Sequence, residues 1–225
     1  MPNLLPRSNV PLIPAELSVG GDLWYEPPLL PQPGEAGYSV ITMDWTAPGV
    51  DFAWPNRART GKPDPWLGAF ETLVEAPQWH ADAPEPHDFA EIMIGLTHTV
   101  SERVLDVFLK FDESAVKYRE IDIRFKGGTP SRRRYFWMHV TRALPAIDFA
   151  NSRIRYLWPK RSRPYPGQHG PVRLMPDIEG IPYLCATTLG SRAVFISDEM
   201  LRTFRGIEPR LAHFEAQDIS GGFTF

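Results

Sequence analysis

The chain has 225 residues, with 24 Lys and Arg against 27 Asp and Glu, so its formal net charge is −3. Hydrophobic residues make up 43% and charged residues 23% of the chain, which excludes a wholly disordered protein. The single cysteine, Cys185, excludes a disulfide-stabilised scaffold, and we expect it to be a small buried hydrophobe.

The N-terminal segment does not read as a secretory signal, because Pro6, Arg7, Pro11 and Pro14 interrupt every apolar run. No stretch of about 18 apolar residues is present, so we expect no transmembrane helix. A lone thiol also fits a reducing compartment. These features together predict a cytoplasmic protein that does not bind a membrane.

The first 90 residues differ in character from the rest of the chain. They carry 15 of the 24 prolines, five of the seven tryptophans and a charge balance of −8, whereas residues 91–225 have a balance of +5. Proline lacks an N–H and fixes φ, so long helices and central strands are excluded here. We expect a proline-rich wrap with short strands at 22–26 and 38–43.

The best helix of the chain is predicted after Ser101. Thr99–Glu102 offers a serine N-cap or a capping box, and apolar residues then recur at three- and four-residue spacing up to Phe111. The helix should end near 110–112. Residues 118–125 then alternate polar and apolar, which predicts a strand with one wet face, and 127–130 reads as a turn.

The remaining segments predict two more strands and a second helix. Residues 135–140 are nearly all apolar, as in a strand covered on both faces, whereas 151–152 and 159–170 read as connections. Residues 193–196 read as a strand that runs into a serine-capped helix at 197–204. Because these elements do not alternate in βαβ order, we predict the α+β class: one domain over 1–225, with a mostly antiparallel or mixed sheet at 91–225 and the wrap at 1–90.

Motifs that carry chemistry are weak. His80, Asp82, Glu85, His87 and Asp88 contain zinc-ligand types, but their spacing matches no helical ligand pair. Gly20–Gly21 and Gly127–Gly128 lack the context of a phosphate-binding loop. The acids at 51, 64, 71 and 75 have nothing to fix their geometry. We therefore predict no catalytic, cofactor-binding or metal-ligating residues.

A basic stretch at 131–173 holds ten Lys and Arg and one acid, Asp148, with aromatic residues interleaved. Cations neutralise phosphates and aromatic rings stack on bases, so a nucleic-acid surface is one interpretation. The acidic overall balance and the lack of a nucleic-acid module pattern oppose it. A solvated face, or a dock for the acidic N-terminal region, is the other interpretation.

Three segments in the same order resemble a bacterial immunity-protein family tied to polymorphic toxin systems. They are a Ser–Glu step leading into a helix at 99–108, an aromatic strand leading to an aliphatic–Asp step and a later Ser at 134–152, and a strand running into a Ser-capped helix at 194–201. The resemblance covers about 95–205 and leaves the first 90 residues and the loop at 159–173 outside. The matching residues Ser101, Asp148, Ser152 and Ser197 look like caps and turn-formers.

The resemblance implies a cytoplasmic antitoxin that binds a cognate secreted toxin, encoded beside it, without catalysis. Interfaces draw their energy from a few Trp, Tyr and Arg anchors, and opposite charge speeds encounter. The acidic, Trp-rich N-terminal half is therefore predicted to contact a basic toxin such as a nuclease. The predicted contact residues are Trp45, Asp51, Trp54, Asp64 and Trp66.

Two alternatives stay open at this point. One is a nucleic-acid or regulatory binding protein that uses the basic stretch. The other is an enzyme whose site is assembled from distant residues, which would need a cleft lined by His139, His169, Cys185 or clustered acids. The tryptophans could also simply pin the proline-rich wrap to the core.

Overall fold

The structure is a computed structural model, and it divides into two compact units, each built from separated stretches of the chain. Unit 1 comprises residues 1–41, 143–198 and 216–225, and unit 2 comprises 42–142 and 199–215. The residues described below are 23–25, 29, 32, 37–43, 53, 55, 73, 75–87, 89, 92–94, 98–157, 165–169, 171–188, 191–206, 214–218 and 223–224. The organisation of 1–225 as one domain stays a prediction.

A four-stranded antiparallel sheet of unit 1 has the order β1-β10-β11-β15. Its strands are β1 (Leu23–Tyr25), β10 (Ile154–Leu157), β11 (Tyr165–His169) and β15 (Phe223–Thr224). A five-stranded sheet has the order β14-β2-β13-β12-β9, with β12 and β9 parallel. Its strands are β14 (Phe214–Asp218), β2 (Tyr38–Met43), β13 (Ser191–Ser197), β12 (Tyr183–Thr188) and β9 (Ala143–Leu144).

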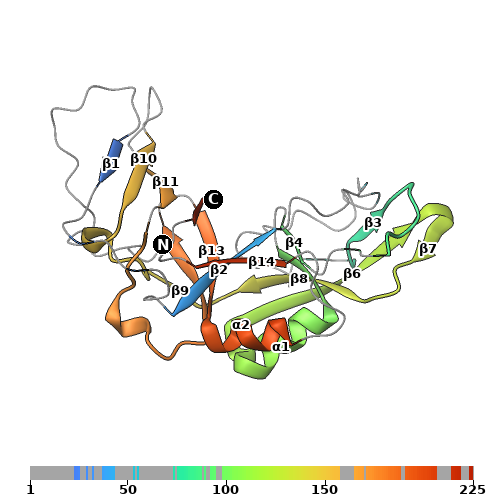
Figure 1. Cartoon of the computed structure of the whole chain (residues 1–225). Coiled ribbons are helices and arrows are strands. Elements are labelled where there is room, and N and C mark those ends of the chain that lie inside the picture. Colours follow the sequence, from blue (N-terminus) through green and yellow to red (C-terminus); the bar gives the residue numbers. More distant parts are fainter. Residues whose placement is uncertain are drawn as a thin grey trace. The chain divides into compact units, whose positions relative to one another are not determined.

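A six-stranded sheet in unit 2 has the order β3-β6-β8-β5-β4, with β7 added on β6. Its strands are β3 (Gln78–His80), β6 (Val116–Phe125), β8 (Tyr135–Val140), β5 (His98–Ser101), β4 (Ile92–Ile94) and β7 (Thr129–Pro130). The helices are α1 (Glu102–Asp112) and α2 (Asp198–Arg205), and the short 3₁₀ turns are η3 (Glu113–Ala115), η4 (Lys126–Gly128), η5 (Phe149–Asn151) and η6 (Pro176–Ile178). Figure 1 shows α1 lying against one face of β6 and β8.

The predicted α+β class is confirmed, with antiparallel pairs joined by the parallel pairs β3–β6 and β12–β9. The predicted helices and the strands at 38–43, 118–125, 135–140 and 193–196 are confirmed to within a few residues. The interpretation of 159–170 as a connection is wrong at 165–169, where β11 pairs with both β10 and β15. Most of the predicted wrap lies outside the described residues.

The first helix begins where the sequence places its cap. Ser101 is extended and buried, and its hydroxyl accepts a hydrogen bond from the Val104 N–H at 3.4 Å, which satisfies one of the amides left open at a helix start. The buried face of α1 is formed by Val104, Leu105, Val107 and Phe108. The Phe108 ring packs on Phe204 of α2 with centroids 5.7 Å apart, so both helices share one apolar layer.

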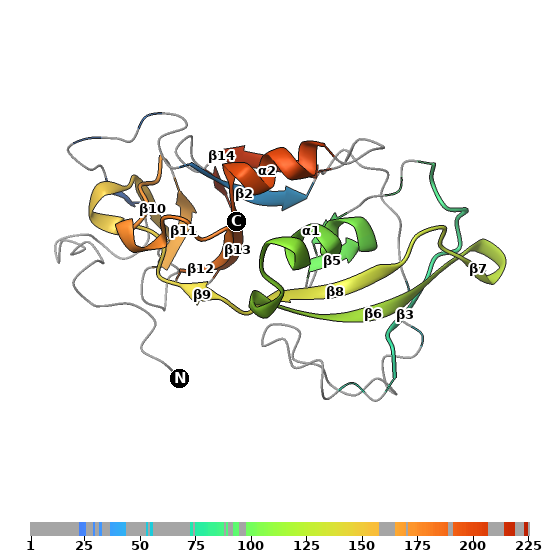
Figure 2. The same ribbon diagram turned by 90° about the horizontal axis from the view of Figure 1, so that it is seen from below.

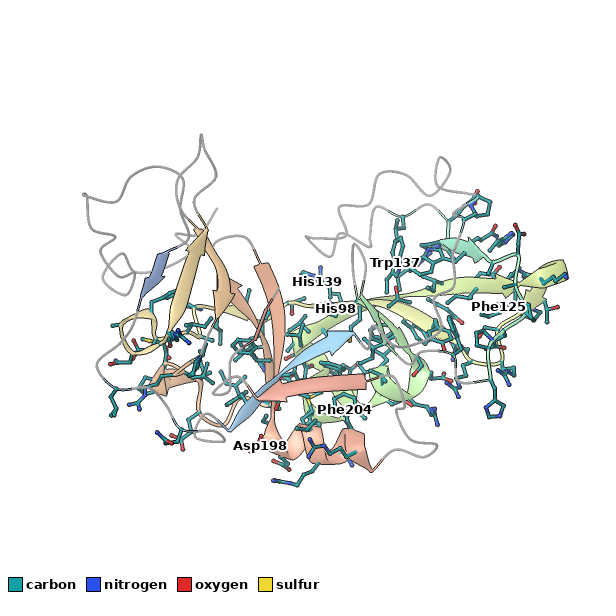
Figure 3. All side chains as sticks on the ribbon, turned by 45° about the horizontal axis from the view of Figure 1, so that its top comes forward. His98, Phe125, Trp137, His139, Asp198 and Phe204 are labelled. Atoms are coloured by element: carbon teal, nitrogen blue, oxygen red, sulfur yellow. The ribbon has the colours of Figure 1, made fainter. Side chains whose placement is uncertain are left out.

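The opposite face of the six-stranded sheet is covered by a separate apolar cluster. Residues directly opposite each other in antiparallel strands share a face, and Ile121 lies opposite Tyr135. The cluster consists of Leu73, Ala81, Phe89, Ile121, Ile123, Phe125, Tyr135 and Trp137, with Trp79 packed against it. Trp79 meets Trp137 edge-on, and Phe89 meets both Phe125 and Tyr135 in the same way. Figure 3 labels Phe125 and Trp137 along these strands.

Unit 1 contains a polar turn with a buried serine at the motif that resembled the immunity family. The Asp148 carboxylate accepts hydrogen bonds from the Ala150 and Asn151 amides and so caps η5. The fully buried Ser152 hydroxyl donates to the Asp148 carbonyl oxygen at 2.6 Å and accepts from the Arg173 N–H at 2.9 Å. The predicted structural roles of Ser101, Asp148 and Ser152 are thus confirmed. Ser197 directly precedes α2, and its own cap stays a prediction.

Replacing Ser152 by alanine should lower the free energy of unfolding by about 1–3 kcal/mol, because the partly buried Arg173 N–H loses its acceptor. Urea titration followed by fluorescence measures the change. Thr141→Ala, which removes a hydroxyl at an exposed position, is the control and should cost about 0.5 kcal/mol or less. Equal losses for the two variants would contradict the structural role of Ser152.

Candidate functional site

The strand β6 is covered over its second half and exposed over its first. Residues 117–120 are all exposed, whereas Ile121, Ile123 and Phe125 are buried. The reason lies in the neighbouring strand: β3 pairs only with Asp122–Arg124. In Figures 1 and 2, β3 accordingly lies beside the half of β6 that is distant from α1. The first half of β6 therefore has β8 on one side and an open edge on the other, as far as the described residues go.

Hydrogen bonds along β6 show which backbone groups point to each side. The Asp122 N–H donates to Pro77 on the β3 side, whereas Ala115 and Ile123 accept from Thr141 and Ser131 on the β8 side. Since successive residues of a strand alternate in direction, the even-numbered residues point away from β8. The N–H and C=O groups of Tyr118 and Glu120 thus point to the open edge, and no described residue bonds to them.

Tyr118 is the most exposed aromatic side chain among the described residues, at 44% of its possible surface. It lies opposite Met138 in the register and so shares the sheet face that carries α1. Its ring meets the buried Phe136 ring nearly at right angles, with centroids 5.9 Å apart. An aromatic ring fixed at its base and exposed at its tip is typical of residues that anchor protein interfaces.

A charged network fixes the same surface. Arg134 donates from Nε and Nη2 to the two carboxylate oxygens of Glu120, each at 2.9 Å, and from Nη1 to Glu102 at the start of α1. The Arg134 guanidinium also lies 5.2 Å from the centre of the Phe136 ring. The hydrogen bonds from Arg134 lower the pKa of Glu120. The network holds Tyr118's neighbours in one arrangement, although each exposed ion pair adds little stability.

A second ion pair joins the segment that precedes β6 to the segment that follows β8. Arg142 bonds to Asp112 at the end of α1, and Asp112 also accepts from the Ser114 hydroxyl and amide. Hydrogen bonds from Ser114 and Arg142 lower the pKa of Asp112. The end of α1 is thereby fixed to the residues that directly follow β8.

The contact residues predicted from the sequence, Trp45, Asp51, Trp54, Asp64 and Trp66, all lie outside the described residues. The assignment of the toxin contact to them stays a prediction. Of the four acids at 51, 64, 71 and 75, Glu75 is the one that is described, and it is partly buried.

The candidate zinc ligands and the cysteine are placed by the structure as far as they are described. His80 belongs to β3, Asp82 and His87 are exposed, and Asp88 lies outside the described residues. Within the described part of the chain, no three His, Cys, Asp or Glu side chains are grouped to hold a metal ion. Cys185 is a buried thiol in β12, opposite Val194, as predicted for a small hydrophobe.

Several basic residues of 131–173 pair with this chain's own acids and carbonyls. Arg132 binds the Glu85 carboxylate at 2.9 Å and the Pro86 carbonyl oxygen at 2.6 Å. Arg133 donates to the carbonyl oxygen of Phe89. Arg132 and Arg133 thus support the interpretation of the stretch as a dock for the chain's own acidic segment along 85–89, whereas Arg134 and Arg142 pair with acids outside that segment.

Sequence reasoning missed the surface at Tyr118. A signal was present, because Tyr118 lies out of phase with Ile121, Ile123 and Phe125 and so belongs to the other face of the strand. The open edge itself had no local signal, since it depends on where β3 stops pairing.

The sequence of the chain matches a family of known proteins. A sequence model described as the Imm11 immunity protein family matches residues 39–177, which is more than half of the chain. The match begins earlier than the expected residue 95 and ends before β13 and α2, so much of the first 90 residues and the segment 159–173 do fall within it. No curated protein matches the chain. No described helix is long and apolar enough to cross a membrane.

Stability should depend on pH through His98. Partial burial and the nearby His139 lower the pKa of His98 to about 4; both residues are labelled in Figure 3. Between this value and about 6.5 the unfolded chain binds more protons at this site than the folded chain, so stability falls as pH falls through that window. His98→Gln should flatten the dependence of the unfolding free energy between pH 6.5 and 4.

The control for His98 is His87→Gln, an exposed loop position that should keep the wild-type slope. Urea unfolding at half-unit pH steps gives the comparison. The same slope in His98→Gln as in the wild-type chain would contradict the assignment of the pH dependence to His98.

Proposed function

Because the chain belongs to the Imm11 immunity protein family, we propose that it protects its own cell by binding and neutralising a cognate secreted toxin. The single observation that carries this function is the family match over residues 39–177. The matched segment includes β5, α1, β6 and β8, and each of these elements contributes buried residues to unit 2. A preformed rigid scaffold of this kind supports binding because little order has to be gained in the complex.

The protein acts on its partner by contact and carries out no turnover in this proposal. It acts in the cytoplasm of the producing cell, where it meets toxin before secretion or toxin delivered by kin.

For the contact surface, the acidic N-terminal half is the first proposal. Residues 1–90 combine a charge balance of −8 with five tryptophans, and Trp45, Asp51, Trp54, Asp64 and Trp66 are the proposed contacts. Tryptophan supplies large anchor surfaces, and acidic charge would speed encounter with a basic toxin such as a nuclease.

Co-expression with the adjacent open reading frame tests the function. We expect the wild-type chain to restore growth to cells that express this toxin, and the variants Asp51→Lys and Asp64→Lys to restore it less well. Asp82→Lys makes the same charge change at an exposed position outside the proposed set and should protect as the wild type does.

The possible outcomes distinguish a failure of the immunity function from a failure of the proposed contact set. No protection and no pull-down by the wild-type chain would reject the immunity function with this toxin. Full protection by every variant at normal protein levels would reject only the proposed contact set.

A further inference from the structure

We propose that the open edge of β6, from Val116 to Glu120, receives an extended segment of the toxin as an added β-strand. The inference rests on the toxin-binding function proposed above and assigns it a place and a mode. Addition of a strand to a free sheet edge is a common way in which a folded domain binds a peptide segment, because backbone hydrogen bonds supply affinity and side-chain contacts supply specificity.

The edge of β6 is open as far as the structure describes its neighbours. The N–H and C=O groups of Tyr118 and Glu120 point away from β8, and no described residue bonds to them. Beyond this point the same side of β6 is occupied, because β3 pairs with Asp122–Arg124. Among the described residues the edge is therefore a short gap in an otherwise paired strand, and an incoming strand would continue the sheet from the point where β3 ends.

This part of β6 is already held in strand geometry. On its inner side it pairs with β8 residue by residue from Val116 to Ile121. On the face that carries α1, the Arg134 fork fixes Glu120, and the Tyr118 ring rests on Phe136. A partner segment would thus meet ordered backbone groups and an exposed aromatic side chain, and most of the ordering cost falls on the partner alone.

The other face of the strand carries positive charge. Lys117 and Arg119 are exposed there, and no ion pair of Arg119 occurs among the described residues. Opposite charges across neighbouring strands are favourable and like charges are not. The added strand should therefore carry an acidic residue opposite Arg119 and an apolar side chain beside Tyr118. This is a local requirement and is independent of the overall charge of the toxin.

Charge also argues against a second copy of this chain as the occupant. Antiparallel self-pairing through the outward groups would place Tyr118 opposite either Tyr118 or Glu120 of the other copy. The first register sets Lys117 opposite Arg119, and the second sets Arg119 opposite Arg119. Both registers bring cations together, and charged residues on an open edge are a known guard against such self-association.

Residue-resolved amide exchange of the chain, free and bound to the purified product of the adjacent open reading frame, tests the proposal directly. In the free chain the Tyr118 and Glu120 amides should exchange rapidly, and in the complex they should slow by about tenfold or more. The Arg119 amide, which points to β8, should be protected in both states and serves as the internal control.

Two variants provide a second measurement. Tyr118→Pro removes an N–H that faces the edge and leaves the β8 ladder intact, so it should weaken toxin binding by about tenfold or more. Arg119→Glu should weaken binding by a similar factor through repulsion of the acidic partner residue. Lys126→Glu makes the same charge change at an exposed position beyond β6 and should bind as the wild type does. Thermal unfolding confirms that each variant is folded.

The inference is overturned if the toxin binds and is neutralised while the Tyr118 and Glu120 amides still exchange rapidly, and the immunity function would then stand. It is also overturned if the free chain sediments as a dimer that Tyr118→Pro converts to a monomer, since the edge would then join two copies. Failure of the wild-type chain to bind the toxin would overturn the proposed function as well.

Discussion

The antiparallel pairing of β6 with β8 is the interaction on which unit 2 depends. Six consecutive residue pairs join the two strands, from Val116 opposite Val140 to Ile121 opposite Tyr135. Because a strand sends successive side chains to opposite faces, this one register decides which residues meet α1 and which meet the cluster around Trp137. A shift by one residue would exchange the two sets and expose both cores.

The same register also determines what remains exposed. The cluster on the Trp137 face covers β6 only from Ile121 onward, and β3 pairs only beyond that point. Tyr118 and Glu120 therefore keep outward backbone groups, and Arg134 meets Glu120 because it directly precedes β8. Packing and the candidate binding surface are thus two consequences of one pairing. The acidic and basic segments of the chain also meet here, since Glu85 binds Arg132 just before β8.

Local patterns predicted the elements whose causes are local. The helix from Glu102 follows from the Ser101 cap and an apolar face, and the strand at 135–140 follows from a continuous apolar run. β11 was missed because Pro166 and Gly167 read as a connection, whereas strand formation there depends on partners at 154–157 and 223–224. The open edge of β6 is likewise set by a distant strand. The tryptophan contact set lies outside the described residues and stays a prediction from composition and charge.

The central claim is that this chain neutralises a toxin by holding it in a stoichiometric complex. The most direct measurement is a titration of the purified toxin's activity against the purified chain, at toxin concentrations well above the dissociation constant. Binding without turnover predicts a linear loss of activity that ends at one equivalent of the chain, with the mass of the toxin unchanged. Complete loss at a small fraction of an equivalent, or a covalent change in the toxin, would contradict the claim.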